Sequence, residues 1–422
     1  MELLPHCSAP LPRICQGFLP LFVDHLATRS GQKDMSWSQD VKATWLEEVI
    51  FLGTGTSSQV PAIHCVTDKN SDCVTCTDAM KPRSKNRRFC TSAIVRGSKQ
   101  GCSGTSSTIL IDCGKSFYES ALRYFPLYGL RNIDALLLTH AHADAMLGLD
   151  DLRSWTMNAC IQTHVDVYLT RECMDTVQQT FPYLVDTSRA TGGGDVGALR
   201  WHIIDPHTSF LAGPQQVPVQ PLYVEHGYTH GGRVPFACLG FRIDTMSYIS
   251  DCVRISRCTH LCRRKSNSQH HIPETTMKKV VGSDLFILDG LKMNRHTSHF
   301  SIPQAIACTL DLCMRHAHRQ LSPPSLTVLT DITHRLEHHS TESQIVTLLD
   351  GLAAWLHQQG WSATDAPSRW WTRIWDEQEN ELHERLQLTP LSSSLSTKHA
   401  HPLVPVMRVA YDGARVTFSK HV

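Results

Sequence analysis

The sequence predicts a layered α/β fold in one domain, with β-sheets packed between layers of helices. Strand patterns dominate the first part of the chain, and helical patterns alternate with strand patterns further on, which favours such layers. Hydrophobic residues make up 41% of the 422 residues, so the chain can bury a sizeable core. No apolar run reaches about 18 residues, so we expect no membrane-spanning helix.

The first part of the chain is expected to form mainly strands. An apolar run at 48–53 predicts a buried strand, and a Gly-rich turn at 53–58 follows it. The next elements, in order, are strands at 93–96 and 107–112, a helix at 116–124, a strand at 133–138, a helix at 145–156 with Asp144 as its N-cap, a strand at 165–169 and a helix at 171–180.

The second part is expected to alternate between strands and helices. The strands are assigned to 217–225, 236–244, 247–250, 285–288 and 326–329, and the helices to 303–315 and 341–360. Near the end of the chain, 406–410 and 414–418 flank an Asp-Gly pair, which predicts a β-hairpin.

One domain is expected to cover 45–422, after an N-terminal tail at 1–44 that we expect to be disordered. The tail lacks a secretory signal, so we expect a cytoplasmic protein; its Ser-containing, acid-poor composition leaves mitochondrial targeting as the alternative. Insertions are expected near 97–107, 186–199, 254–280 and 360–402.

The charge balance restricts the partners. Lys and Arg number 40 and Asp and Glu 39, giving a formal net charge of +1. Such a chain has no overall field to draw it to nucleic acid or an anionic membrane, so we expect neither as a partner. The basic run at 81–88 is expected to be a solvated face, although Lys85, Arg87 and Arg88 could contact phosphate.

Ligand-type residues follow the apolar strand at 133–138. His140, His142 and Asp144 stand at alternate positions, and alternate residues of an extended segment point to the same side. Imidazole and carboxylate together suit zinc, iron or manganese. Because His226, Asp251 and Asp331 also stand at expected strand ends, these positions predict a metal site.

The series resembles the metallo-β-lactamase superfamily. The turn at 53–58, Val60-Pro61, and the segments at 86–88 and 91–92 resemble the branch that contains PhnP-type phosphoribosyl cyclic phosphodiesterases. The resemblance covers about 48–418 and implies a four-layer αββα sandwich. It also implies hydrolysis through a metal-bound hydroxide, with one or two divalent ions, zinc or manganese, at the catalytic site.

The resemblance assigns roles to these residues. His140, His142 and His226 would bind the first ion. Asp251 would bridge to a second ion, which Asp144 would bind. The family pattern has a His where this chain has Ala145 and another where it has Asp331. Asp331 is then an oxygen replacement at the second site, which either takes a harder ion or is empty.

A later segment supplies a candidate proton donor. Leu288-Asp289-Gly290 and the residues at 297–300 resemble a family segment in which a His acts near the leaving group. We therefore place His299, together with Asp144, among the catalytic residues, with His299 as general acid. His296 is the nearby alternative.

A second constellation predicts a structural zinc. Cys65 precedes Cys73 and Cys76, whose CxxC spacing suits one tetrahedral ion. The resemblance supplies His334 as the fourth ligand, and His64 is a competing ligand. Such a zinc would tie an early loop to a late strand.

We expect a metal-dependent hydrolase that acts on a small cyclic phosphate or a nucleotide-like phosphodiester. RNA processing by the same superfamily is one alternative. The other is a catalytically degenerate metal-binding protein, for which Ala145 and Asp331 are the evidence. A homodimer is compatible with the sequence.

Overall fold

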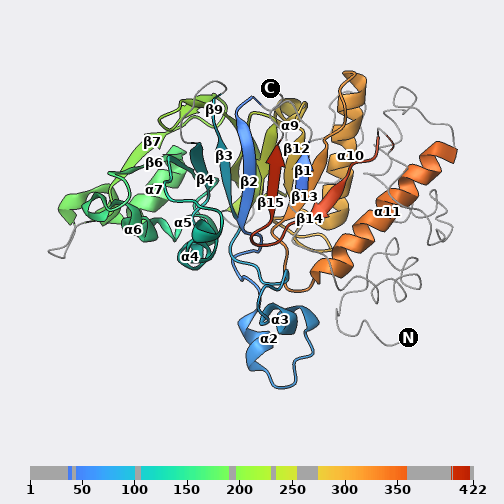
Figure 1. Cartoon of the computed structure of the whole chain (residues 1–422), viewed down its shortest axis with the longest axis horizontal. Helices are drawn as coiled ribbons and strands as arrows, with labels where there is room; N and C mark the ends of the chain where they lie inside the picture. Colours follow the sequence, from blue (N-terminus) through green and yellow to red (C-terminus); the bar gives the residue numbers. More distant parts are fainter. Residues whose placement is uncertain are drawn as a thin grey trace.

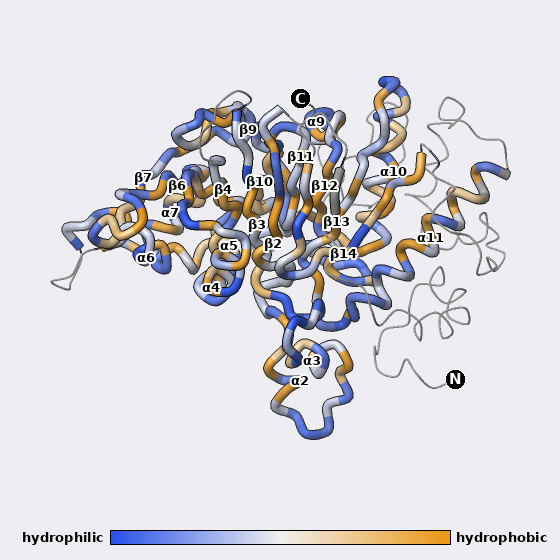
Figure 2. Tube along the Cα trace, viewed as in Figure 1, coloured by the Kyte–Doolittle hydropathy of each residue, from blue (hydrophilic) through white to orange (hydrophobic). Residues whose placement is uncertain are grey.

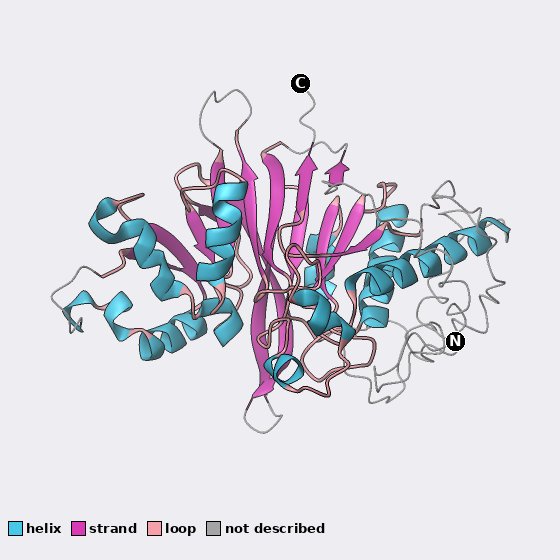
Figure 3. Ribbon diagram, turned by 60° about the horizontal axis from the view of Figure 1, so that its bottom comes forward, coloured by secondary structure: helices cyan, strands magenta, loops and turns pink. Residues whose placement is uncertain are grey.

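The computed structural model describes residues 37–39, 44–99, 106–189, 196–229, 234–253, 274–358, 401 and 403–418. Within these residues two β-sheets pack face to face, and helices cover both outer faces (Figures 1 and 3). The predicted four-layer αββα sandwich is therefore confirmed. In the part of the chain that is described, no helix has both the length and the apolar character needed to cross a membrane.

The first sheet has eight described strands, of which the outermost at one edge is the short β1. In spatial order they are β1 (Trp37–Gln39), β15 (Arg415–Phe418), β2 (Leu46–Gly53), β3 (Ser92–Gly97), β4 (Ser107–Ile111), β5 (Ala135–Leu137), β6 (Val165–Leu169) and β7 (Leu199–Ile203).

The second sheet has seven described strands. In spatial order they are β14 (Met407–Val409), β13 (Leu326–Thr330), β12 (Leu285–Asp289), β11 (Met246–Ile249), β10 (Val234–Ile243), β9 (Val217–Thr229) and β8 (Phe210–Ala212). From β11 to β14 the strands run parallel, so their carboxyl ends meet at one edge of the sheet.

Helices cover the two outer faces and also form a small projecting lobe. The lobe holds α2 (Ile63–Thr67) and α3 (Val74–Ala79), which lie away from both sheets in Figure 1. The others are α4 (Phe117–Leu127), α5 (Ala143–Met146), α6 (Arg153–Thr156), α7 (Arg171–Thr180), α8 (Pro182–Val185), α9 (Glu274–Val280), α10 (Ile302–His318) and α11 (His338–Gln358).

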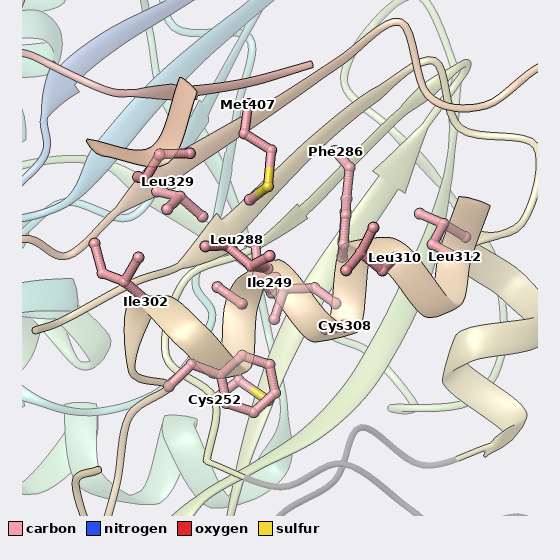
Figure 4. Close-up of a cluster of buried hydrophobic side chains, with 14 of the residues drawn as sticks. Ile249, Cys252, Phe286, Leu288, Ile302, Cys308, Leu310, Leu312, Leu329 and Met407 are labelled. Atoms are coloured by element: carbon pink, nitrogen blue, oxygen red, sulfur yellow. The ribbon is translucent and has the colours of Figure 1, made fainter. Parts of the chain in front are cut away.

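Three hydrophobic clusters fill the spaces between the layers. One lies between the two sheets and includes Leu137 and Phe241. A second joins the first sheet to α4 and its neighbours. The third joins the second sheet to α9, α10 and α11, and Figure 4 shows Cys308 and Leu310 of α10 against Phe286 of β12. Figure 2 shows the apolar residues gathered along the central strands.

The start of α10 follows from local sequence. Ser301 and Gln304 form a capping box: the Gln304 backbone N–H donates to Ser301 Oγ, and the Ser301 N–H donates to Gln304 Oε1 at 2.9 Å. Pro303 stands in the first turn, where its missing N–H costs no helical hydrogen bond. The predicted helix at 303–315 is confirmed.

The predicted hairpin near the end of the chain is wrong. Strands β14 and β15 join different sheets, because the turn between them crosses from one sheet to the other. The Asp412 carboxylate accepts hydrogen bonds from the Phe89 N–H at 2.6 Å and from Thr54 Oγ1 at 2.7 Å, and the Gly413 N–H donates to Phe51 O. These contacts with the first sheet hold the turn open.

The predicted helix at 145–156 is also wrong. The helix α5 begins at Ala143 after His142 as N-cap, so Asp144 lies in its first turn and does not cap it. The helix stops at Met146, and a 3₁₀ turn, Leu149–Leu152, and α6 follow. The Gly148 N–H donates to Cys113 O at 2.8 Å and so does not continue the helix, and Gly148 packs so close to Gly114 that a Cβ atom would lie 2.5 Å from the Gly114 carbonyl oxygen.

Two expected boundaries change. Residues 37–39 form β1 against β15, so the expected disordered tail at 1–44 is corrected there; 1–36 and 40–43 lie outside the described residues. Within the expected insertion at 254–280, α9 buries Met277 and Val280 in the core. The segments 100–105, 190–195, 254–273 and 359–400 of the expected insertions lie outside the described residues.

Candidate metal centre

Ligand-type side chains from both sheets meet at one edge of the sandwich. His140 and His142 follow β5 of the first sheet, and the Leu239 N–H of the second sheet donates to Thr139 O at 2.9 Å beside them. Asp251 follows β11, and Asp289 is the last residue of β12. The residues meet because the carboxyl ends of these strands face the same edge.

The nitrogen atoms of His140, His142 and His226 lie within 4.8 Å of one another and could hold a metal ion. His226 does not end its strand as we expected, since β9 continues to Thr229. Instead, the pairing of β9 with β10 shifts register opposite Phe236, and Gly227 adopts a φ of +75°. This bulge re-aims the His226 ring, as bulges beside functional sites do.

Hydrogen bonds fix which ring nitrogen faces the centre. His226 Nδ1 donates to Ser298 O at 2.7 Å, and His140 Nδ1 lies 2.8 Å from Thr139 Oγ1. The remaining nitrogen, Nε2, therefore carries a lone pair in each ring. His140 Nε2 is buried and has no hydrogen-bond partner among the described residues, and a cation would satisfy it. The site therefore fits the metal that the sequence predicts.

Asp112 supports His140 through Thr139. The Thr139 hydroxyl and N–H donate to the two oxygens of the buried Asp112 carboxylate at 2.8 Å each. The hydroxyl is then free to accept from His140 Nδ1. Sequence reasoning assigned no role to Asp112 or Thr139. The available signal was that each polar residue comes just after an apolar strand, Asp112 after β4 and Thr139 after β5.

We expect Thr139→Val to weaken metal binding at this centre by about 10- to 100-fold, because the substitution keeps the shape but breaks the link from Asp112 to His140. Competition with a chromophoric chelator measures the affinity. Thr139→Ser keeps the hydroxyl and should bind as the unchanged protein does. Equal affinity in the Val and Ser variants would contradict this account.

Burial keeps the imidazoles neutral. It lowers the pKa of His140 to about 3 and that of His226 to about 4. Burial alone would raise the pKa of Asp251, but the neighbouring His226, His140 and His299 outweigh it and hold that pKa below its usual range. Neutral imidazoles beside an ionised carboxylate are the donor states that a divalent ion needs.

Asp251 lies between the imidazoles and His299. Its Oδ1 is 3.6 Å from His226 Nε2 and 3.7 Å from His299 Nε2. His299 Nδ1 lies 2.9 Å from Asp289 Oδ2, so Asp289 orients the ring. Burial alone would lower the pKa of His299, but Asp289 and Asp251 raise it to about 9. The Cys252 and Phe300 N–H groups also donate to Asp289 Oδ2, and sequence reasoning gave this residue no role.

His142 is exposed, and its ring stacks on Phe236 with centroids 4.6 Å apart. The centre is thus open to solvent on the His142 side. Asp144 interacts electrostatically with Asp251, His142 and His299, so it lies at the same centre. Burial raises the pKa of Asp144. His296 lies beside His299 with ring centroids 5.5 Å apart.

Asp331 directly follows β13 in a left-handed conformation with a φ of +60°. Its Oδ1 is in hydrogen-bonding contact with the Thr91 hydroxyl, and its buried Oδ2 has no partner among the described residues. Among those residues, no group of three candidate donor atoms within 4.8 Å of one another includes Asp144 or Asp331. The structure thus gathers five of the predicted residues more tightly than these two.

A second group brings together Cys65, Cys73, Cys76 and His334 at the base of the lobe. His334 Nδ1 lies 3.5 Å from Cys65 Sγ and 3.6 Å from Cys73 Sγ. Sulfur and nitrogen ligands of one tetrahedral zinc lie about 3.6 Å apart, so the spacing fits a structural zinc. The ring of His64 only packs edge-on against His334.

Arg88 holds the loop that carries His334. It is fully buried and donates to Thr333 O and Leu336 O at 3.0 Å each. Arg88 is thus a structural residue and not the exposed phosphate contact that the basic run suggested. Asn86 adds a second tie, because its amide donates to Glu337 and to Asp78.

The model of the β-lactamase superfamily domain matches residues 107–319. A diphosphatase from the PhnP family has a similar structure, with a TM-score of 0.54 and 21% identity over 89% of this chain and 99% of that one. Zn²⁺-bound PqqB from Methylobacterium extorquens is also similar in structure, with a TM-score of 0.50 and 16% identity over 87% of this chain and 99% of that one.

A curated relative, the octanoyltransferase of Porphyromonas gingivalis, is 26% identical over 321 residues, which are 74% of this chain. The match covers 52% of the relative, so this chain spans about half of that protein's length. The name octanoyltransferase therefore refers to a protein about twice as long as the region that matches this chain.

Proposed function

This chain belongs to the β-lactamase superfamily, whose domain model matches half of its length, and on that premise we propose that it hydrolyses small phosphodiesters. The observation that carries the proposal is the juxtaposition of three imidazoles and Asp251 with the His299–Asp289 pair. The imidazoles and Asp251 then form a cation-binding part of the site, and His299 with Asp289 forms a proton-donating part beside the same substrate. The shared fold with a PhnP-family diphosphatase supports phosphoric ester chemistry.

His140, His142, His226 and Asp251 would hold a divalent ion, which would make an attacking water more acidic and offset the negative charge that develops on phosphate oxygens. Three imidazoles suit zinc, and Asp251 also suits manganese.

The remaining residues handle protons. Hydrolysis forms a bond from the water oxygen to phosphorus and breaks the bond from phosphorus to the leaving oxygen. We assign Asp144 as the carboxylate that orients the attacking water and accepts its proton. His299 Nε2 donates a proton to the leaving oxygen, and Asp289 is a positioning residue that keeps the His299 ring aimed at the centre.

The direct test is hydrolysis of bis(p-nitrophenyl) phosphate and of 2′,3′- and 1,2-cyclic phosphates by the purified, metal-loaded chain. A precursor tRNA tests the RNA-processing alternative. Turnover of the small diesters without cleavage of RNA is the expected result. Metal binding without any turnover would favour the degenerate alternative and overturn the proposal.

His299→Gln should reduce kcat about 10²- to 10⁴-fold on a diester with an alkoxide leaving group, because that oxygen must gain a proton as it leaves. On bis(p-nitrophenyl) phosphate the loss should be much smaller, since nitrophenolate leaves without a proton. Asp289→Asn should likewise reduce kcat more for the alkoxide leaving group than for nitrophenolate, but by a smaller factor.

His296→Gln is the matched control, because His296 lies next to His299 and lacks the link to Asp289. It should leave both rates nearly unchanged. If His296→Gln shows the leaving-group split and His299→Gln does not, His296 is the proton donor instead.

A further inference from the structure

The metal centre has a complete donor set on only one side of Asp251. On that side, His140, His142 and His226 converge, and Asp251 Oδ1 lies 3.6 Å from His226 Nε2. Ligands that bind one ion tetrahedrally at about 2.1 Å lie about 3.4 Å apart, so this spacing fits a single coordination shell. One ion can be held here without movement of the backbone.

A second ion would need donors beyond Asp251, and these are missing or spread out. Ala145, a buried residue of α5, offers no ligand atom. Among the described residues, neither Asp144 nor Asp331 belongs to a group of three candidate donors that all lie within 4.8 Å of one another. Even opposite ligands of an octahedral shell with bonds of about 2.1 Å are only about 4.2 Å apart, so these carboxylates do not form one shell.

Asp331 is further withdrawn by its hydrogen bonds. The Thr91 hydroxyl lies 2.8 Å from Gly55 O and also contacts Asp331 Oδ1. Because Gly55 O already accepts from the Thr91 N–H, the Thr91 hydroxyl can donate its one hydrogen to Asp331 Oδ1. One of the two oxygens of the Asp331 carboxyl group is therefore already engaged by Thr91. Burial raises the pKa of the Asp331 carboxyl group.

His299 does not supply the missing site. Its Nε2 lies within 4.8 Å of ligand atoms of Asp251 and His226, but His226 already belongs to the first group. Because His226 Nδ1 is bonded to Ser298 O, only one lone pair is left, and one lone pair binds one ion. The two overlapping groups therefore surround a single position.

We propose that the catalytic centre of this protein holds one divalent ion, bound by His140, His142, His226 and Asp251, and has no second catalytic metal site. The proposal concerns the same centre as the proposed function and takes from it only that these four residues bind metal. Together with the zinc at Cys65, Cys73, Cys76 and His334, the chain then binds two ions in all.

The test is metal content by elemental analysis, together with anomalous diffraction from crystals of the zinc-loaded chain. We expect two ions per chain and one anomalous peak beside Asp251. The double variant Ala145→His plus Asp331→His restores both missing imidazoles and should hold three ions, with two peaks about 3.5–4 Å apart. Ala145→Ser plus Asp331→Asn, which adds no imidazole, is the control and should hold two.

Two peaks flanking Asp251 in the unchanged protein would overturn the inference. Failure of the double variant to gain an ion while it keeps the folded circular-dichroism spectrum would overturn the account of the missing donors. If the double variant does not fold, the diffraction from the unchanged protein decides. One ion without phosphodiester turnover contradicts the proposed function alone, whereas two ions with turnover contradict this inference alone.

Discussion

We expect Asp251→Asn to reduce kcat/KM for phosphodiesters by about 10³-fold or more. The substitution preserves the shape of the side chain but removes the charge that faces both His226 and His299. A loss of about 4 kcal/mol of charge stabilisation at the transition state corresponds to that factor. Steady-state rates on bis(p-nitrophenyl) phosphate at saturating metal, with metal content measured on the same sample, give the result.

His142→Ala should cause a loss of similar size, and it is informative because His142 is exposed and its removal leaves no cavity in the core. Asp175→Asn on α7 and His318→Ala at the end of α10 make the same chemical changes at exposed positions far from the centre in sequence. Both controls should keep full activity. Activity that survives both Asp251→Asn and His142→Ala would show that the site is assigned wrongly.

The second large effect is expected when the candidate zinc site at the base of the lobe loses a ligand. The hydrophobic cluster of the lobe contains only Val60, Ala62, Cys76 and Ala79 as buried members, too little to stabilise it without a metal. Cys76→Ala removes one ligand and leaves Cys65, Cys73 and His334 incomplete. Zinc sites of this type supply much of the folding free energy of small modules.

We therefore expect Cys76→Ala to lower the melting temperature by about 10 °C or more and to open the lobe to protease cleavage between 62 and 80. Some activity should also be lost, because the Ile332 N–H donates to Thr54 O next to the loop of His334. Cys160→Ala removes an exposed thiol and should change neither property. An unchanged melting temperature and protease pattern in Cys76→Ala would rule out a stabilising zinc there.

The sequence pattern placed candidate residues correctly at the ends of apolar strands. Asp251 follows β11 and Asp331 follows β13, as the residue pattern predicted. His226 was expected at the end of a strand, yet it lies within β9 at a bulge. A Gly after a ligand-type residue inside a strand pattern, here Gly227, was the available signal for that bulge.

Residues that orient the ligands were harder to find. Asp289 stands in a segment that the sequence singled out, but its contact with His299 joins positions ten residues apart through the end of β12. The link from Asp112 through Thr139 to His140 joins two strands of the first sheet. Such contacts depend on strand pairing, which local periodicity does not specify.

Local sequence alone determined most element types, the layered α/β class and the candidate ligands at 140, 142, 226 and 251. These follow from hydrophobic periodicity and from the few side chains that bind metal. Only the tertiary structure decided that β14 and β15 separate into different sheets and that Asp331 turns to Thr91. Both outcomes depend on contacts between segments more than 200 residues apart, such as Asp412 with Phe89, and non-local contacts of this kind leave no mark in a local pattern.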